Sequence, residues 1–353
     1  MAKRTATSIE QGIVLVAALV GALVGGPWAS ADSSSPESLL APPNQDGPVV
    51  VRVAFDIRDI NEIYDEEETF AFTAVRMLTW IDPRQAFTPT AGMNEKVFQG
   101  KYQFNELAAG WYPQMVLVNE SGLNETNGVV LRVQPDGTST LIETINATAE
   151  SELDLRWFPF DNHRLEAVFQ VLGFDRDEVL LEAASEDLRL DGTVRIPQWR
   201  ITGSSMSVRD RGAASAVVVS VDVERDSFYV RRLITIPLAV IVLLSFSVFW
   251  MDRSSVGDRI SVSFIGILTG VTYQLVMGNV LPHISYFTLI HAFLGLSFMI
   301  MSATVVISLV VGMLDRNGDF ARGDRIDRRC RWIFPLTFFG LLGVIFAVAN
   351  VIF

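Results

Sequence analysis

Residues 260–314 read ISVSFIGILTGVTYQLVMGNVLPHISYFTLIHAFLGLSFMIMSATVVISLVVGML, a run of 55 residues without aspartate, glutamate, lysine or arginine. A helix needs about 20 apolar residues to cross the hydrocarbon core of a bilayer, so this run is long enough for two spans. Pro282 divides the run, because proline lacks a backbone N–H and clashes with the preceding helical turn. The sequence therefore predicts spanning helices over 260–281 and 286–314.

Two further segments without charged residues, 233–250 and 332–353, raise the number of predicted spanning helices to four. The connection 315–331 contains six arginines and the connection 252–259 contains two, whereas 282–285 contains no lysine or arginine. Cytoplasmic loops carry an excess of Lys and Arg. We therefore expect the two arginine-bearing connections in the cytoplasm and the polar half of the chain outside the cell.

The amino terminus has the three parts of a signal peptide, which we place at residues 1–31. Lys3 and Arg4 are basic, residues 12–20 are apolar, and Ala29-Ser30-Ala31 offers small residues for cleavage. An uncleaved N-terminal membrane anchor is the alternative. Residues 32–48 are rich in serine and proline and predict a flexible leader.

Residues 49–230 are polar and predict a domain of many short strands. Apolar runs or alternation are separated by turn residues, and Pro135-Asp136-Gly137 is a turn in which proline presets φ and glycine tolerates positive φ. Several short strands with regular turns indicate a β-sandwich. The expected fold is mixed: an extracellular all-β sandwich at 49–230, followed by an all-α four-helix transmembrane domain at 231–353. The strands are expected at 49–57, 70–80, 111–119, 129–133, 165–172 and 216–223.

Composition argues against several classes of function. The chain has 353 residues, of which 28 are Lys or Arg and 40 are Asp or Glu, and its net charge of −12 is the wrong sign for binding nucleic acid. Cys330 is the single cysteine and there are three histidines, so we expect no intrachain disulfide and no metal site. The sequence contains no motif of a serine hydrolase, zinc protease, Walker loop or dinucleotide-binding fold. We therefore expect neither an enzyme nor a bound cofactor.

The predicted helix at 260–281 has polar and aliphatic residues on a single stripe. Its members are spaced by 4, 3, 4, 3 and 4 residues, which places them on one helix face. Polar groups at membrane depth are costly unless they face protein or water, so the stripe predicts either a packed interface or a water-filled pathway. Asp258 lies at the cytoplasmic end, either as a solvated helix start or as one carboxylate of a ring. The stripe consists of Ser261, Ile265, Leu268, Thr272, Leu275 and Asn279.

Residues 151–165 read SELDLRWFPFDNHRL and resemble the signature loop of pentameric ligand-gated ion channels, the Cys-loop receptor superfamily. The Phe-Pro-Phe-Asp core is intact at 158–161. Ser151 and Leu165 occupy the positions of the two cysteines of animal members, so the chain resembles the prokaryotic members. Further matches span about 50–353: Trp80-x-Asp82-x-Arg84-x-x-Phe87, Trp111-x-Pro113 (although Gln114 replaces the usual acid), Arg225 twelve residues before Pro237, Gly257-Asp258-Arg259, and Pro282.

This resemblance implies a pentamer, expected here to be of identical subunits, with the second span of each subunit lining a central pore. Leu268 falls at the family's hydrophobic gate, and five aliphatic rings can exclude water from a narrow pore. Asp258 falls at the acidic ring of cation-selective members, and the Pro-Ala pattern usual in anion-selective members is absent. The resemblance therefore implies a channel for monovalent cations. Its pore-lining residues are Asp258, Ser261, Ile265, Leu268, Thr272, Leu275 and Asn279.

The resemblance also implies a coupling site between the β domain and the helices. Acidic and basic positions of relatives meet there, and a partly buried arginine between two carboxylates is costly to disrupt. A structural ion pair that merely holds the fold is the alternative. The coupling residues are Asp65, Phe158, Pro159, Asp161, Arg225 and Pro282.

The stimulus is left open between a small molecule and protons. The positions that form an aromatic cage in amine-binding relatives are not aromatic here, although Phe174 lies two residues from one of them, Leu172. Arg209 could suit an anionic ligand or be a solvated loop residue. Glu68 belongs to a run of four carboxylates, in which like charges raise pKa values.

We expect a multi-pass protein of the cell (inner) membrane with its β domain extracellular or periplasmic. The chain's partners would be identical subunits, lipid, permeant cations and the stimulus. A membrane-anchored extracellular sensor without conduction is the alternative. A transporter is disfavoured because the four spans show no internal repeat.

Overall fold

The computed structural model describes residues 41–43, 47–90, 94–108, 110–183, 185–190, 192, 194–252, 256–278 and 281–352. The predicted signal peptide and most of the predicted leader lie outside the described residues. Residues 42–353 form one compact unit. This unit contains one apolar core among the strands and a second among the helices.

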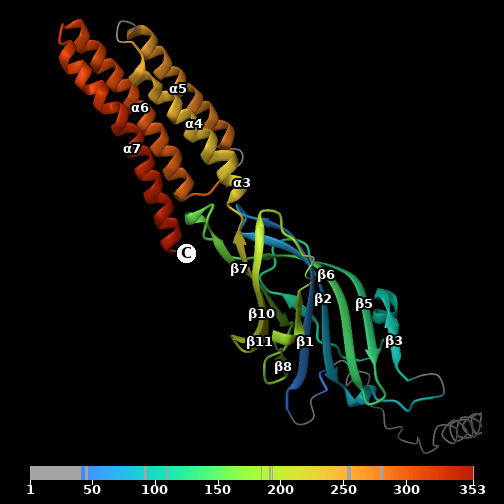
Figure 1. The fold of residues 1–353 in the computed structure, drawn as a ribbon. Coiled ribbons are helices and arrows are strands. Elements are labelled where there is room, and N and C mark those ends of the chain that lie inside the picture. The colour runs from blue at the N-terminus through green and yellow to red at the C-terminus, as the bar shows by residue number, and fades with distance from the viewer. Residues whose placement is uncertain are drawn as a thin grey trace, which may run out of the picture. The chain divides into compact units, whose positions relative to one another are not determined.

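The strands form two sheets (Figure 1). Most neighbouring strands pair antiparallel, but β8 and β9 pair with β1 in parallel. The larger sheet has the order β3-β5-β6-β2-β1-β8, with β9 also paired to β1, and the smaller has the order β10-β11-β7-β4. The strands are β1 (Val49–Tyr64), β2 (Thr69–Ile81), β3 (Lys96–Gln99), β4 (Met115–Leu117), β5 (Glu125–Val133), β6 (Thr138–Glu150), β7 (Asn162–Val171), β8 (Val179–Glu182), β9 (Leu188–Leu190), β10 (Trp199–Arg211) and β11 (Ala214–Arg225).

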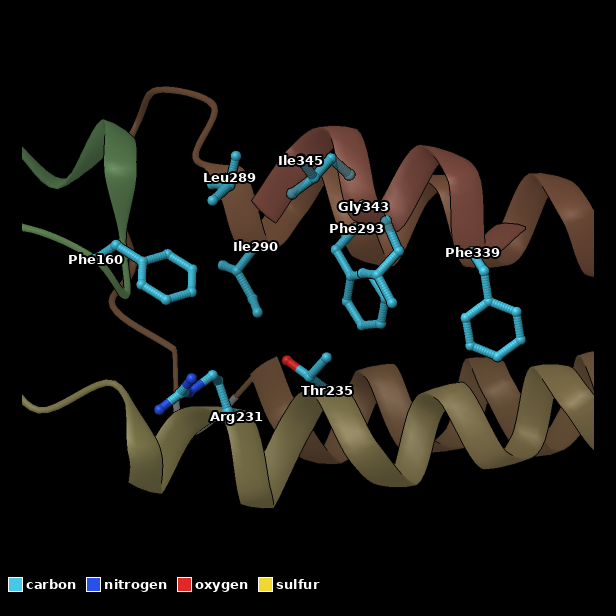
Figure 2. A pocket seen from close by; sticks show the side chains of 10 residues that line it. Phe160, Arg231, Thr235, Leu289, Ile290, Phe293, Phe339, Gly343 and Ile345 are labelled. Carbon is cyan, nitrogen blue, oxygen red and sulfur yellow. The ribbon is translucent and has the colours of Figure 1, made fainter. Parts of the chain in front are cut away.

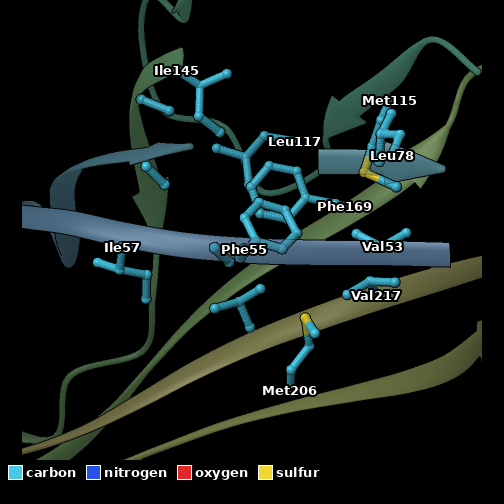
Figure 3. Packing of buried hydrophobic residues seen from close by; sticks show 14 of the residues in the cluster. Val53, Phe55, Ile57, Leu78, Met115, Leu117, Ile145, Phe169, Met206 and Val217 are labelled. Atoms are coloured by element: carbon cyan, nitrogen blue, oxygen red, sulfur yellow. The ribbon is translucent and has the colours of Figure 1, made fainter. Parts of the chain in front are cut away.

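The core of the β domain lies between the two sheets. Side chains alternate along β2 between buried and less buried positions, as a strand with one face on a core requires. Phe55 of β1 and Phe169 of β7 meet across this core with ring centroids 4.7 Å apart (Figure 3). The predicted all-β sandwich is therefore confirmed.

The strand predictions differ from the structure in two ways. The segment 111–119 forms a strand only at β4, because Pro113 cannot donate a ladder hydrogen bond and Trp111 is buried from a loop. The strands β3, β6, β8, β9 and β10 were not predicted. The strand β6, for example, has buried positions that alternate with threonines and include alanines, which give a weak apolar signal. It nevertheless pairs along its whole length with β2.

From Phe228 onward the described elements are helices (Figure 1). Within the described part of the chain, three helical segments are long and apolar enough to cross a membrane: Phe228–Trp250, Val256–Gly278 and Leu289–Arg316. The first contains α3 (Phe228–Val230), a π-helical turn (Arg231–Thr235), α4 (Ile236–Ser245) and a 3₁₀ turn (Phe246–Trp250), and the others are α5 (Val256–Gly278) and α6 (Leu289–Arg316). Residues 281–288 around Pro282 are not helical, as the proline predicted.

The last helix, α7 (Phe320–Ile352), begins well before the predicted start at residue 332. The arginine-rich segment 320–331 continues the same helix, because arginine is a good helix former whether or not it is exposed. That α7 forms a fourth span stays a prediction. Short helical turns elsewhere are Pro83–Gln85, α2 (Gly100–Tyr102), Gln103–Leu107, Leu155–Trp157 and Ser185–Asp187.

Helix α5 packs closely on both of its neighbours. A side chain on Gly266 would meet Ser245 Cβ of α4 at 3.2 Å, and one on Gly270 would overlap Met301 of α6. Pro237 deprives the carbonyl of Leu233 of its ordinary helical donor, and the Tyr273 hydroxyl of α5 donates a hydrogen bond to that carbonyl. The first and second membrane helices are thereby joined by packing and by a polar contact.

Candidate functional site

A buried ion cluster lies where the last strand runs into the first membrane helix. Arg225, the final residue of β11, donates from Nε to both oxygens of Asp161 (2.9 and 3.1 Å) and from Nη2 to Asp65 Oδ1 (2.8 Å). The backbone N–H of Arg225 also donates to the carbonyl of Asp161 (3.1 Å). Three predicted coupling residues from distant parts of the chain therefore meet at one guanidinium.

Aromatic rings and burial strengthen this cluster. The guanidinium of Arg225 lies 4.0 Å from the ring centroid of Trp199 and 4.8 Å from that of Phe158, and its side chain is 4% exposed. Cations over aromatic faces are attracted by the ring quadrupole, more strongly when desolvated. His163 Nε2 lies 2.7 Å from Asp161 Oδ2.

The pKa of Asp161 lies below its ordinary value. Burial is the largest single influence and raises this pKa. The hydrogen bond from His163 and the charge and hydrogen bonds of Arg225 lower it, and their sum outweighs the effect of burial. The carboxylate form is therefore the stable one inside the cluster.

The loop that carries Asp161 also enters the helical core. Leu155 and Phe158 belong to the same buried apolar cluster as helix residues, and Pro159 follows Phe158 through a cis peptide bond. Tyr286, just before α6, accepts a hydrogen bond from the N–H of Leu155 (2.9 Å). Ser151 Oγ donates to the carbonyl of Arg164 (3.1 Å), so a hydrogen bond joins the two ends of the loop.

A second contact joins the β1–β2 turn to the connection between α5 and α6. The backbone N–H of His283 donates to Glu66 Oε1 (2.9 Å), and His283 Nδ1 lies 2.7 Å from the same oxygen. These two hydrogen bonds lower the pKa of Glu66, so the rise expected from the run of like charges is wrong for this carboxyl. Pro282 and Leu281 line a surface cavity of about 310 Å³ together with Asp65, Glu66 and Glu67. The predicted coupling residue Pro282 therefore lies beside the acidic turn.

We expect Glu66→Gln to lower the thermal stability of the purified protein slightly at pH 7, because an exposed pair contributes little. A carboxyl whose pKa is lowered on folding adds stability above its ordinary pKa, 4.5 for Glu66, and loses it as the pH falls through the lowered value. The difference in melting temperature between the wild type and Glu66→Gln should therefore shrink below pH 4.5. Glu67→Gln is the matched control, and an equal, pH-independent loss in both variants would contradict the prediction.

The polar and aliphatic stripe of α5 is exposed on the isolated chain. Ile265, Leu268 and Leu275 are 62%, 67% and 72% exposed, and Ser261 and Thr272 are exposed as well. The opposite face of α5 is buried and includes Arg259, Ser263, Gly270 and Met277. Asn279, the remaining predicted member, lies outside the described residues.

Two adjacent charged residues at the cytoplasmic end of α5 lie in opposite environments. Asp258 is exposed, on the side of the stripe. Arg259 is 2% exposed and binds Asp327 of α7. The helix therefore presents a carboxylate to solvent and turns the neighbouring guanidinium into the protein.

The residues considered for stimulus binding do not form one site. Phe174 packs against Trp111, with ring centroids 5.9 Å apart, whereas Arg209 lies 3.5 Å from Glu166. Leu172 is half exposed. Glu68 is exposed, adopts a positive φ of 52°, and accepts a hydrogen bond at its carbonyl from Ser151. Glu68 is thus linked to the signature loop, while the other three have separate surroundings.

An apolar cavity of about 350 Å³ lies between the helices beside the signature loop (Figure 2). Phe160 comes from that loop, Arg231 and Thr235 from the first membrane helix, and Phe293 and Phe339 from α6 and α7. Such a lining suits a hydrocarbon chain or a small apolar molecule. Among the described residues, no group of three or more His, Cys, Asp or Glu side chains is arranged to hold a metal ion.

Two contacts at this site were not predicted from the sequence. The pairing of Glu66 with His283 was not predicted, although the acidic turn and a histidine next to Pro282 were both visible in the sequence. The stacking of Trp199 on Arg225 was also missed, because nothing in the local sequence indicates which strand lies over the guanidinium.

Comparisons with known proteins agree with this geometry. Residues 36–232 match the family model described as the neurotransmitter-gated ion-channel ligand binding domain. The chain is 25% identical over 318 residues to a proton-gated ion channel of Gloeobacter violaceus, a match that covers 88% of this chain and 84% of that protein. It is 24% identical over 272 residues to the gamma-aminobutyric acid receptor subunit rho-2 of Bos taurus and 23% identical over 276 residues to rho-1 of Homo sapiens.

The two receptor matches cover 74% and 75% of this chain, which spans 57% of each subunit's length. The family model covers more than half of the chain, and the proteins that match are ligand-gated channels of membranes rather than enzymes. The structure adds the β domain and the apolar helices that such a multi-pass channel needs. The chain belongs to the neurotransmitter-gated ion-channel family, as a pentameric ligand-gated channel subunit of the prokaryotic type.

Proposed function

We propose that five identical copies of this chain form a cation-selective channel whose pore is lined by α5. The exposed stripe of α5 carries this proposal. A helix that merely anchored a sensor would place aliphatic residues alone toward lipid, because polar groups in hydrocarbon are costly. Here Ser261 and Thr272 share the exposed face with Ile265, Leu268 and Leu275, which suits a face turned toward water.

In this proposal the aliphatic rings close the pore. Five copies of Leu268, flanked by rings of Ile265 and Leu275, form an apolar constriction that water leaves when the pore is narrow, and ions cannot pass without hydration. Ser261, Thr272 and Asn279 offer polar surface to hydrated ions between and beyond these rings. Asp258 forms a ring of carboxylates at the cytoplasmic mouth, which concentrates cations and repels anions.

The stimulus is transmitted through the buried ion cluster and the signature loop. Asp65, Asp161 and Arg225 connect the β1–β2 turn, the signature loop and the first membrane helix, and Tyr286 connects the signature loop to the start of α6. Motion of the β domain would reach Pro282 and α5 through these contacts. Phe158 and Pro159 support the cluster from the same loop.

The stimulus itself is either protons or a small molecule bound by the β domain. One relative is named a proton-gated channel, and Glu68 offers an exposed carboxylate beside the signature loop. Leu172, Phe174 and Arg209 are the residues to test for a small ligand. Recordings from the purified protein in bilayers, over a range of pH and then with small amines and acids at fixed pH, would separate the two stimuli.

We expect Asp258→Asn to reduce the cation-to-anion permeability ratio about tenfold, because a ring of like charges creates a potential of several kT. Reversal potentials in asymmetric NaCl measure this ratio. Asp319→Asn is the control, since Asp319 is another acidic residue of the cytoplasmic side and pairs with Arg322. Wild-type reversal potentials that follow chloride would contradict cation selectivity, and a reconstituted protein without current under any stimulus would favour the non-conducting sensor.

A further inference from the structure

Helices α5 and α7 are joined by a buried pair of charges near the cytoplasmic end of the proposed pore. Arg259 donates from Nη1 to Asp327 Oδ2 (2.9 Å) and from Nη2 to Asp327 Oδ1 (2.7 Å). The side chains of Arg259 and Asp327 are 3% and 4% exposed. Such a two-point contact between guanidinium and carboxylate fixes orientation as well as distance.

The pair lies at the level of the proposed selectivity ring. Asp258 and Arg259 are consecutive residues, so their α-carbons differ by about 1.5 Å along the helix axis. Five exposed arginines at this level would cancel the charge of five Asp258 carboxylates. The structure instead exposes Asp258 and buries Arg259.

We propose that Asp327 is a selectivity-positioning residue, which neutralises Arg259 and holds it away from the cytoplasmic mouth of the pore. The five Asp258 carboxylates then act on ions without an opposing ring of positive charge. This inference rests on the proposed pore and its cation selectivity. It assigns a part in ion selection to α7, a helix that contributes no residue to the proposed pore.

Other ion pairs of this region do not have the same geometry. Asp319 with Arg322 and Asp324 with Arg328 lie within α7 or at its start, and their arginines are 68% and 74% exposed. Exposed pairs are screened by water and contribute little. By contrast, Asp327 reaches a different helix, and among the described residues no acceptor lies within hydrogen-bonding distance of Arg259 Nε. The orientation of Arg259 therefore depends on Asp327.

The test is Asp327→Asn, recorded in asymmetric NaCl beside the wild type. Without the carboxylate, Arg259 is a buried charge without its counterion, and rotation into the watery mouth relieves it. We expect the cation-to-anion permeability ratio to fall about tenfold, as for Asp258→Asn, because either change weakens the negative potential at the cytoplasmic mouth of the pore. Asp319→Asn is the control and should keep the wild-type reversal potential.

A double variant shows whether Asp327 acts through Arg259. Arg259→Gln combined with Asp327→Asn removes both charges and leaves Asp258 unopposed, so we expect cation selectivity to be restored. If Asp327→Asn alone does not assemble, coexpression with excess wild-type subunits gives mixed channels, whose reversal potential should move part of the way toward chloride. A merely structural role for Asp327 would reduce the number of channels without moving the reversal potential.

The outcomes separate this inference from the function on which it rests. Suppose that Asp258→Asn changes the reversal potential while Asp327→Asn channels, pure or mixed, keep the wild-type value. The proposed role of Asp327 is then wrong, whereas the proposed selectivity ring of Asp258 is supported. If the double variant is as unselective as Asp327→Asn, Asp327 does not act through Arg259, and the inference is also wrong. If Asp258→Asn itself changes nothing, the proposed selectivity ring fails.

Discussion

Stimulus-evoked current is expected to disappear when Arg225 is replaced by alanine. The substitution leaves Asp161 buried, with its side chain 1% exposed, and removes its guanidinium partner. Breaking a buried ion pair by removing one partner costs about 3–5 kcal/mol. Because the cluster joins the signature loop and the β1–β2 turn to the end of β11, just before the first membrane helix, that energy is lost at the proposed coupling site.

The measurement compares current with the amount of assembled protein at the membrane. Arg164→Ala is the matched control, because Arg164 also forms an ion pair, with Asp222 (2.8 Å), but its side chain is 55% exposed. Arg225→Lys should recover only part of the response, since lysine cannot bind two carboxylates through a planar fork or stack on Trp199 in the same way. Large evoked currents from assembled Arg225→Ala pentamers would refute the coupling role.

The ion cluster around Arg225 also limits how acidic a solution the folded protein tolerates. Since the pKa of Asp161 is lowered in the folded protein, the carboxylate adds stability above the ordinary aspartate pKa and loses it as the pH falls through the lowered value. The ion cluster should therefore remain intact in mildly acidic solution. If protons are the stimulus, groups that titrate at higher pH than Asp161 must sense them.

Leu268→Ser is expected to open the channel without any stimulus. A serine ring lets water remain in the constriction, whereas a leucine ring excludes it. If each subunit loses about 1 kcal/mol of apolar contact in the closed state, five subunits lose roughly 5 kcal/mol, and the equilibrium shifts toward the open state by between three and four orders of magnitude. Standing current in the absence of stimulus, blocked by a large pore-entering cation, would be the observation.

Leu336→Ser is the matched control for this prediction. Leu336 lies on α7 and is 69% exposed on the isolated chain, close to the 67% of Leu268. If α5 rather than α7 lines the pore, the control should respond to stimulus as the wild type does. Equal behaviour of the two serine variants would place the pore elsewhere or show that no pore exists.

The mixed fold was predictable because its signals are local. An uncharged run of 55 residues divided by Pro282 predicted two of the spanning helices, and these are α5 and α6. Apolar alternation or apolar runs predicted β1, β2 and β7, while β3, β6, β8, β9 and β10 were not predicted. In β6 small and polar residues interrupt the apolar signal. The extension of α7 over 320–331 was missed because charged residues give no apolar periodicity.

The stripe of α5 could also be predicted from the sequence, because residues three and four apart always share a helix face. The partners of Arg259 and Glu66 could not be. Asp327 is 68 residues from Arg259, and His283 is 217 residues from Glu66, so these pairs meet only after helices and domains have packed.

By itself, therefore, the sequence determined a strand-rich domain followed by apolar helices, and it determined which face of α5 is polar, since helix and strand periodicity depend on neighbouring residues alone. Only the tertiary structure decided that Asp258 is exposed while Arg259 is buried beside Asp327, and that Trp199 stacks on Arg225. A charge is stable in the interior only beside its counterion, and long-range packing chooses which counterion that is.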